Sequence, residues 1–390
     1  MQETIPAKST RYHALDIWRG VVCVVVVLEH AAVCLWGGEG TYMDSTWATR
    51  AITTCLTLNI GAPLFFVISG YCIASSLESS RRKGVTPVRF LARRLWRIFP
   101  PYWASLAVIG ALVIVLDRLG LRWLHHTTVG LELFAPSDFS TAQWIGNITL
   151  TETWRPLGGG HAAMLLNRVS WALCYQEQFY LVCFLALVLL PNRLHAALAG
   201  ATLAIVGFRL VTRDIGTDQY FAGLFPDLWH EFAVGLLLFW RINVARTVAS
   251  KRAVEVGLLA LFLLGCWSGQ VTTAAAAGFG LLLIFCYRWD SAVARVDRLD
   301  PVRACGKRSY SVYLIHLPVC TVGNAALAAL GLSGFWPRAL VMIPVVTLAS
   351  IAAGWAFYRV ADRRFSDLPS FQGWQARLAA NRPRVAVAEA

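Results

Sequence analysis

Charged side chains are scarce in this chain of 390 residues, at 15% against about 25% in an ordinary soluble domain. Together with 57% hydrophobic residues, this scarcity excludes a soluble globular core and predicts a polytopic membrane protein. The formal net charge of +13 does not indicate nucleic-acid binding, because the basic residues collect in the short segments between apolar runs. We therefore expect membrane lipid, and no nucleic acid, as a partner.

The sequence also lacks the usual spacings of cysteine sites. None of the ten cysteines forms a CxxC pair or a metal-binding pattern, and most lie within apolar runs, where cysteine behaves as a small hydrophobe. We expect neither a disulfide framework nor a bound metal. No small-residue cleavage site follows a short apolar core at the start of the chain, so we expect no removable signal peptide. No repeat of 20–50 residues is visible, which weakens the case for an inverted-repeat transporter.

Apolar runs that are long enough to cross a bilayer, about 20 residues each, recur along the chain. We predict an all-α transmembrane bundle of about ten spans, with a polar arm at residues 1–13, a transmembrane domain at 14–360 and a disordered tail at 361–390. The longest connection, 119–170, is expected on the outer side. The spans are expected at 14–36, 56–77, 98–118, 171–190, 194–211, 220–240, 254–270, 272–288, 310–331 and 337–360.

The distribution of Lys and Arg predicts the orientation. Most of these residues lie in alternate connections, chiefly 78–97, 241–253 and 288–309, and beyond residue 359. Cytoplasmic loops carry such an excess in membrane proteins. We therefore expect the N- and C-termini to be cytoplasmic.

The first expected span, LDIWRGVVCVVVVLEHAAVCLW from Leu15 to Trp36, carries Asp, Arg, Glu and His side chains. Ionisable groups inside a span are unfavourable and usually functional. Arg19 and His30 are eleven residues apart, close to three helical turns, so they share one helix face about 16 Å apart along the axis. Glu29 is turned by about 100° from His30 and cannot be its simple in-helix partner. We interpret His30 with Glu29 as functional and Arg19 as a residue at the membrane surface.

A basic stretch, RFLARRLWRIFPPYW from Arg89 to Trp103, leads into the third expected span. Arg94 and Arg97 are three residues apart and share a helix face, where they can grip a phosphate or pyrophosphate bidentately. Trp96 offers a flat ring for stacking. The positive-inside excess also explains a basic loop at this place, and the two interpretations are evenly balanced.

Two more ionisable side chains interrupt later spans. Glu177, in SWALCYQEQFYLV, lies about two turns into a span that enters from the outer side, so its depth approaches that of His30. A buried carboxylate needs a partner, and His30 and Arg209 are the candidates. His316, in YSVYLIHLPV, fits a hydrogen-bonded structural role at least as well as a reactive one.

Five motifs follow one another over nearly the whole chain: LDIWRGVVCVVVVLEH, FFVISGY, RRLWRIFPPYW, SWALCYQEQFYL and YSVYLIH. As an ordered set they resemble the acyltransferase 3 family of integral membrane O-acyltransferases. The Arg19-(ten residues)-His30 spacing and the Arg94-x-x-Arg97 pair carry most of the specificity. The resemblance implies ten spans, acyl-CoA (commonly acetyl-CoA) as the donor, and hydroxyl acceptors on surface glycans, antibiotics or other secreted metabolites. It also implies functional roles for these four residues and for Glu177.

Acyl transfer from a thioester to a hydroxyl needs a base for the hydroxyl proton and a stabiliser for the oxyanion. A neutral histidine in a partly dry pocket suits the first task. We therefore hypothesise that His30 is the general base and that Glu177 or Glu29 orients it. The family pattern varies at Glu29, which gives that residue less weight.

The basic cluster would then bind the donor. We expect Arg94 and Arg97, helped by Arg19 and by stacking on Trp96, to hold coenzyme A at the cytoplasmic mouth of a multi-pass protein of the inner (plasma) membrane. The acceptor is expected to be a carbohydrate or a glycosylated small molecule. A membrane transporter or exporter without acyl transfer is the alternative, since it would also place charged residues midway through spans. A purely structural or sensor protein is a third alternative.

Overall fold

The structure is a computed structural model, and it describes residues 12–36, 46–126, 131–155, 163–214, 223–332 and 334–365. Within these ranges the regular structure is entirely helical, which confirms the all-α prediction. The expected arm before residue 12 and the expected disordered tail beyond residue 365 lie outside the described residues.

Each segment that was expected to cross the membrane overlaps a long helix of the described residues. These helices are α1 (Leu15–Trp36), α3 (Gly61–Arg82), α4 (Pro87–Arg118), α6 (Trp171–Leu189), α7 (Leu194–Asp214), α8 (Phe225–Asn243), α9 (Val248–Trp267), α10 (Val271–Cys286), α13 (Ser309–Ala329) and α15 (Ile343–Val360). In the described residues, seven helical stretches are long and apolar enough to cross a bilayer, and they include all of these helices except α7, α8 and α9. The count of ten spans therefore stays a prediction.

Short helices connect the long ones. The α-helical connections are α2 (Trp47–Thr57), α5 (Thr141–Thr149), α11 (Asp290–Val293), α12 (Asp300–Lys307) and α14 (Phe335–Pro337). A π-helical turn, η9 (Arg338–Met342), leads into α15. The 3₁₀ turns are η1 (Arg122–Leu124), η2 (Pro136–Asp138), η4 (Arg168–Ser170), η5 (Pro191–Arg193), η7 (Tyr287–Trp289), η8 (Asp297–Leu299) and η10 (Asp362–Arg364).

Two expected boundaries were wrong. The segment 56–77 begins within α2 and crosses a short break, because α2 ends at Thr57 and α3 begins at Gly61, with Asn59 between them in the left-handed region at φ 52°. The stretch Thr49–Arg82 is still one of those that are long and apolar enough to cross a bilayer. The helix that contains the expected span 98–118 begins eleven residues earlier than the span was expected to begin. This helix, α4, begins at Pro87, where the Thr86 side chain accepts a bond from the Arg89 amide as an N-cap, and it continues through its two internal prolines.

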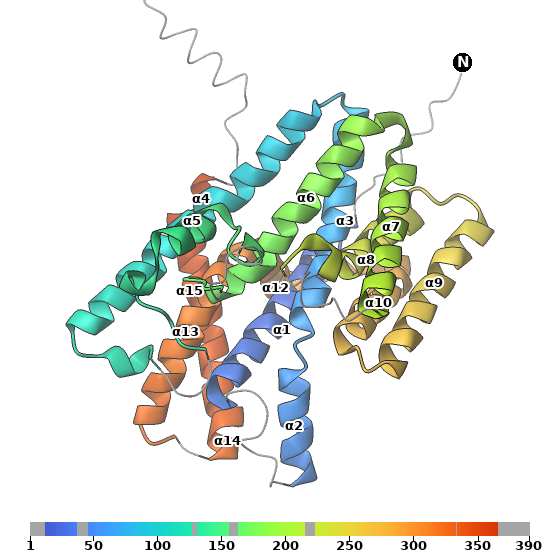
Figure 1. The fold of residues 1–390 in the computed structure, drawn as a ribbon. Coiled ribbons are helices and arrows are strands. Elements are labelled where there is room, and N and C mark those ends of the chain that lie inside the picture. Colours follow the sequence, from blue (N-terminus) through green and yellow to red (C-terminus); the bar gives the residue numbers. More distant parts are fainter. Residues whose placement is uncertain are drawn as a thin grey trace, which may run out of the picture.

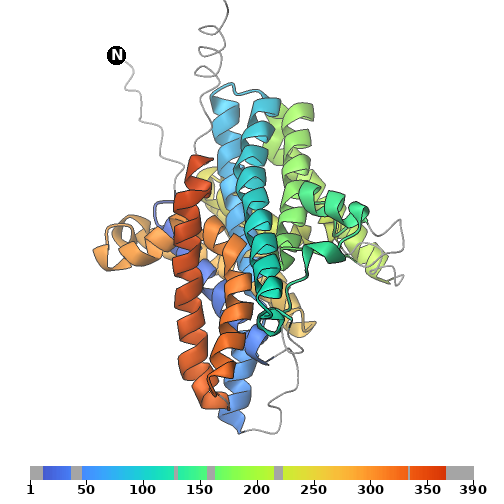
Figure 2. The ribbon, with the colours of Figure 1, turned by 90° about the vertical axis from the view of Figure 1, so that its left-hand side faces the viewer.

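Helix α1 lies in the middle of the bundle, in contact with α3, α12, α13 and α15 (Figure 1). Helices α3, α4 and α6 extend furthest at one end, the upper end of Figures 1 and 2, where a short turn joins α3 to α4. This turn is basic, with Arg81, Arg82 and Lys83, and we call this end the basic end of the bundle. Helix α1 begins on the side of this end and runs away from it.

The surface of the bundle is apolar over long stretches. Leu259, Leu263 and Trp267 on α9 are 47%, 56% and 86% exposed, and similar residues stand out from α4, α6 and α15. Exposed apolar surface of this extent is unfavourable in water and fits contact with lipid. The fold is therefore that of a helical membrane protein.

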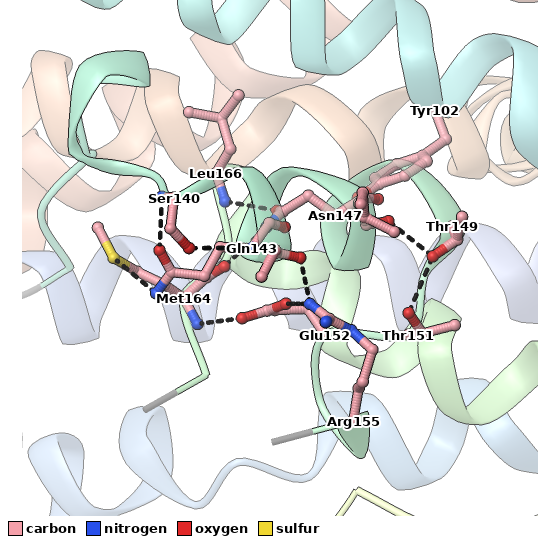
Figure 3. A network of polar contacts seen from close by, with 12 residues as sticks. Tyr102, Ser140, Gln143, Asn147, Thr149, Thr151, Glu152, Arg155, Met164 and Leu166 are labelled. Carbon is pink, nitrogen blue, oxygen red and sulfur yellow. Dashed lines mark hydrogen bonds and ion pairs between the residues drawn. The ribbon is translucent and has the colours of Figure 1, made fainter. Parts of the chain in front are cut away.

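A folded segment between α4 and α6, described at residues 119–126, 131–155 and 163–170 and which we call the cap segment, packs its helix α5 against the side of α4 (Figure 1). Figure 3 shows its polar network, which is centred on two buried residues, Asn147 and Glu152. The Asn147 side chain donates to the carbonyls of Gln143 (2.9 Å) and Met164 (2.7 Å), while Glu152 accepts from the Met164 amide (3.2 Å) and from Arg155 (3.0 Å). Such bonds satisfy buried polar groups, so this segment is held as an ordered cap.

The crossing of α3 and α8 depends on two glycines. A Cβ atom on Gly70 would lie 2.1 Å from the carbonyl oxygen of Phe232, and one on Gly235 would lie 2.1 Å from that of Val67. The two helix backbones are therefore in direct contact, as small residues allow in membrane proteins.

We predict that Gly70→Ala destabilises the protein by about 1–3 kcal/mol, because the methyl group forces α3 and α8 apart. Gly257→Ala on α9 is the matched control, since nothing lies within 4 Å of its Cβ position. Thermal unfolding in detergent micelles measures both. Equal melting temperatures for the two variants would contradict the close crossing.

Candidate active site

Two cavities adjoin along α1. The first, which we call the arginine cavity, has a volume of about 340 Å³ and lies toward the basic end. The second, the histidine cavity, has a volume of about 320 Å³ and lies toward the other end. The arginine cavity is lined by Arg19, Arg94 and Arg97 together with polar groups of α3, α6 and α13. The histidine cavity is lined by Val26, Glu29, His30, Val33, Asn59, Ala62, Phe65, Leu131, Val169, Trp171, Ala172 and Tyr313.

The three arginines come from two helices that are far apart in sequence. Arg19 contacts Asp16 and the hydroxyl of Ser309, each at 3.3 Å. The Arg94 guanidinium lies 5.9 Å from the ring centroid of Tyr180 on α6, within cation–π range, and the Arg97 side chain is exposed. Among the described residues, no carboxylate pairs with Arg94 or Arg97. Their charge is therefore available to an anion.

Uncharged polar side chains complete the arginine cavity. The Gln176 amide donates to the Ser69 hydroxyl at 2.8 Å and also contacts the Tyr180 hydroxyl, which joins α6 to α3. The Tyr310 hydroxyl donates to the Ile98 carbonyl at 2.8 Å and joins α13 to α4. Hydrogen bonds between residues that line the arginine cavity therefore also hold α6 against α3, while the bond from Tyr310 holds α13 against α4.

The His30 ring has a defined orientation. Its Nδ1 lies 2.8 Å from the Val26 carbonyl oxygen, one turn earlier in α1. Because a carbonyl only accepts hydrogen bonds, Nδ1 carries the proton in the neutral ring. The lone pair is then on Nε2, and His30 lines the histidine cavity with a nitrogen that can accept a proton.

A second histidine lies beside it. The rings of His30 and His316 meet edge to face, with centroids 4.8 Å apart and an interplanar angle of 83°. His316 is fully buried, and its Nδ1 lies 2.7 Å from the Tyr313 carbonyl oxygen, so its Nε2 also carries the lone pair. In the described part of the chain, this Nε2 has no hydrogen-bond partner. The sequence left the role of His316 open, and the structure puts it against the expected base.

Glu29 holds the break between α2 and α3. Its two carboxylate oxygens accept bonds from the amides of Ile60 (2.7 Å) and Gly61 (3.0 Å), at the start of α3. A carboxylate at this position satisfies free amide groups and the positive end of the helix dipole. The break places Asn59 in the wall of the histidine cavity. Glu29 therefore shapes the cavity that contains His30.

Two expected site residues lie outside the lining of both cavities. Glu177 is half-buried on α6, next to Gln176, which does line the arginine cavity. Trp96 is 40% exposed on α4, with its ring edge-on to Phe365. The structure therefore brings together Arg19, Arg94 and Arg97 in one cavity, and His30 with Glu29 in the other. It does not bring Glu177 or Trp96 into either.

Sequence reasoning missed several side chains of the histidine cavity. Asn59 and Trp171 offer N–H donors there, and neither makes a hydrogen bond within the described residues. Phe65 and Tyr313 stack on each other at the side that faces the arginine cavity. The motif YSVYLIH carried a signal for α13, because Tyr313 is three residues from Tyr310 and three from His316 and is therefore a neighbour of each on the helix surface. Asn59 carried no comparable signal.

The two cavities suit different parts of one reaction. Cationic side chains without carboxylate partners can hold phosphate groups. A neutral imidazole in an apolar cavity with nearby N–H donors can accept a proton and stabilise developing negative charge. In the described residues, no cluster of His, Cys, Asp or Glu side chains could hold a metal ion.

Comparison with known proteins agrees with this chemistry. The family model for the acyltransferase domain, acyltransferase 3, matches residues 12–358. The chain is 26% identical over 358 residues to a protein named as the membrane-bound transacylase BcsY of Komagataeibacter xylinus, covering 88% of this chain and 81% of the relative. It is 30% identical over 281 residues to the exopolysaccharide production protein ExoZ of Rhizobium meliloti, covering 70% of this chain and 80% of that protein.

A third relative is the O-acetyltransferase OatA of Staphylococcus aureus, 23% identical over 292 residues. The match covers 68% of this chain but only 46% of that longer protein. No solved structure matches this chain. The family match across nearly the whole chain and the helical membrane fold lead to one conclusion: this chain belongs to the acyltransferase 3 family and is a membrane O-acyltransferase.

Proposed function

We propose that the protein moves an acyl group, most simply acetyl, from acyl-CoA to a hydroxyl of a glycan or a glycosylated metabolite. The observation that supports this most is that the arginine cavity and the histidine cavity adjoin along one helix. The first offers charge for a nucleotide donor and the second offers a base for an alcohol. The family match disfavours an exporter without acyl transfer, because it assigns the whole membrane domain to acyltransferases.

The donor binds with its phosphates in the arginine cavity. Arg94 and Arg97 supply charge that no described carboxylate neutralises, and Arg19 adds a third guanidinium from α1. Trp96, which is exposed beside Arg97, remains the proposed stacking surface for the adenine ring. The thioester end of the donor then extends along α1 toward His30, about 16 Å away.

The reaction is a direct acyl transfer. The acceptor hydroxyl oxygen attacks the thioester carbonyl carbon while His30 Nε2 takes the hydroxyl proton. The tetrahedral intermediate collapses with cleavage of the carbon–sulfur bond, and the proton passes from His30 to the leaving thiolate, which gives free coenzyme A. Asn59 and Trp171 are the N–H donors that line the cavity where the oxyanion forms.

The neighbours of His30 keep its ring in place. His316 packs edge-on against it, and we propose that its buried ring limits the rotation of His30 and stabilises the imidazolium that forms. Glu29 acts through the α3 terminus that it caps. Glu177 remains a proposed orienting carboxylate, to be tested by Glu177→Gln.

The acceptor belongs to the surface or secreted carbohydrates. The relative ExoZ is named for exopolysaccharide production and OatA for O-acetyl transfer, which supports a sugar hydroxyl as the acceptor. The positive-inside distribution supports a multi-pass protein of the inner (plasma) membrane, with its termini and the arginine cavity on the cytoplasmic side. The donor then enters from the cytoplasm, while the cap segment and the histidine cavity face outward.

We predict that His30→Ala lowers acetyl transfer by about 10²–10⁴-fold, the usual contribution of a general base. The assay is release of free thiol from acetyl-CoA by the purified protein in the presence of candidate glycan acceptors. His126→Ala is the matched control, because that histidine is exposed and pairs with Glu132 outside both cavities. Full activity of the His30 variant, at normal accumulation in the membrane, would exclude the proposed base.

We predict that Arg94→Ala and Arg97→Ala each raise the KM for acetyl-CoA by about 10-fold, since a charge-assisted bond to a phosphate contributes about 1.5–3 kcal/mol. The turnover number should change little, because the base remains intact. Arg93→Ala on the same helix is the control, since Arg93 is exposed and does not line the cavity. Equal KM values for all three variants would mean that Arg94 and Arg97 do not bind acetyl-CoA and reflect only the excess of basic residues on the cytoplasmic side.

A further inference from the structure

One side chain belongs to both cavities. Phe65, on α3, lines the arginine cavity and the histidine cavity, and it is the only residue of the described chain that the two linings share. Helices α1, α3, α6 and α13 each contribute residues to both cavities, so the two cavities follow one another along the same four helices. Phe65 lies where they meet.

The order of residues on α3 supports this placement. Ala62, one turn before Phe65, lines the histidine cavity, while Ser69, one turn after it, lines the arginine cavity. Residues three and four apart share a helix face. One face of α3 therefore runs from the histidine cavity to the arginine cavity, with the Phe65 ring between them.

The opposite wall is fixed. The Tyr313 ring stacks on Phe65, with centroids 5.7 Å apart and an interplanar angle of 10°. Tyr313 is 9% exposed, and its hydroxyl donates to the Val169 carbonyl, which ties it to the cap segment. Phe65 has no polar group to anchor it and is only half-buried, because its ring borders open space on two sides. Of the two rings, Phe65 is therefore the one whose position no hydrogen bond fixes.

We propose that Phe65 determines which acyl donors reach His30, by setting the width of the passage between the arginine cavity and the histidine cavity. This inference rests on the proposed function. The acyl group leads the donor through the passage, so the ring of Phe65 must move aside against Tyr313 for each thioester that enters. A short acyl group needs a small displacement of the ring, and a longer one needs a larger displacement.

The same ring separates two environments. The arginine cavity is polar and borders the basic end, whereas the histidine cavity contains the base. An aromatic partition limits the entry of water to the thioester and the imidazole, and exclusion of water prevents hydrolysis as a side reaction. Phe65 therefore affects both the choice of donor and the fraction of thioester that is lost to water.

The test compares acetyl-CoA with octanoyl-CoA for the full-length purified protein. We expect Phe65→Ala to raise the ratio of kcat/KM for octanoyl-CoA over acetyl-CoA by about 10-fold or more, the scale on which a pocket discriminates small differences in apolar groups. Thiol release without an acceptor should also rise. Phe65→Trp, with a larger ring, should shift the ratio in the opposite direction. Phe65→Leu should give a smaller shift than Phe65→Ala and serves if the alanine variant unfolds.

Phe285→Ala on α10 is the matched control, because Phe285 is 50% exposed and lies outside both cavities. One outcome is that the unaltered protein transfers acetyl groups while the Ala, Leu and Trp variants of Phe65 show the same donor ratio and the same hydrolysis as it does. That result would exclude the proposed role of Phe65 and leave the proposed function intact. Absence of acetyl transfer by the unaltered protein with every acceptor would instead overturn the proposed function itself.

Discussion

The uninterrupted course of α1 through the bundle sets the distance between the Arg19 guanidinium and the His30 imidazole. Its intrahelical hydrogen bonds satisfy the backbone, so the segment can cross an apolar environment without breaking. Along it, Arg19 and His30 stay on one face, about 16 Å apart, as eleven residues at about 1.5 Å each require. The distance between the arginine cavity and the histidine cavity follows from the positions of their lining residues along this helix. Helices α3, α6 and α13 then complete both cavities by packing around it.

The position of the His30 lone pair depends on one backbone contact. The Val26 carbonyl accepts from Nδ1, which leaves Nε2 as the basic nitrogen of the neutral ring. His316 makes an equivalent bond with Tyr313, one turn earlier on α13, so two neutral rings can face each other without repulsion. The carbonyls of ordinary helices thus select the tautomers, and no carboxylate is required for that purpose.

The arrangement also keeps the arginine side chains away from His30. Guanidinium groups gather in the arginine cavity, and the carboxylate of Glu29, the acidic side chain of the histidine cavity, is occupied by the α3 amides. The ring pair of Phe65 and Tyr313 stands between the two compartments. A charge in a region of low polarity acts over a longer distance than in water, and this division separates the guanidinium groups from the imidazole of His30.

The sequence by itself determined the helical membrane fold, the approximate positions of the long helices, the face shared by Arg19 and His30, and the placement of Arg94 and Arg97 on one face of their helix. All of these follow from hydropathy and helical periodicity, which are local properties. Only the tertiary structure decided which side chains meet: His316 beside His30, Gln176 rather than Glu177 in the arginine cavity, and Glu29 as the cap of α3. Depth along a span can be counted from sequence, but the rotation of one helix against another cannot. That rotation depends on close packing such as the contact of Gly70 with Gly235, residues that are far apart in the chain.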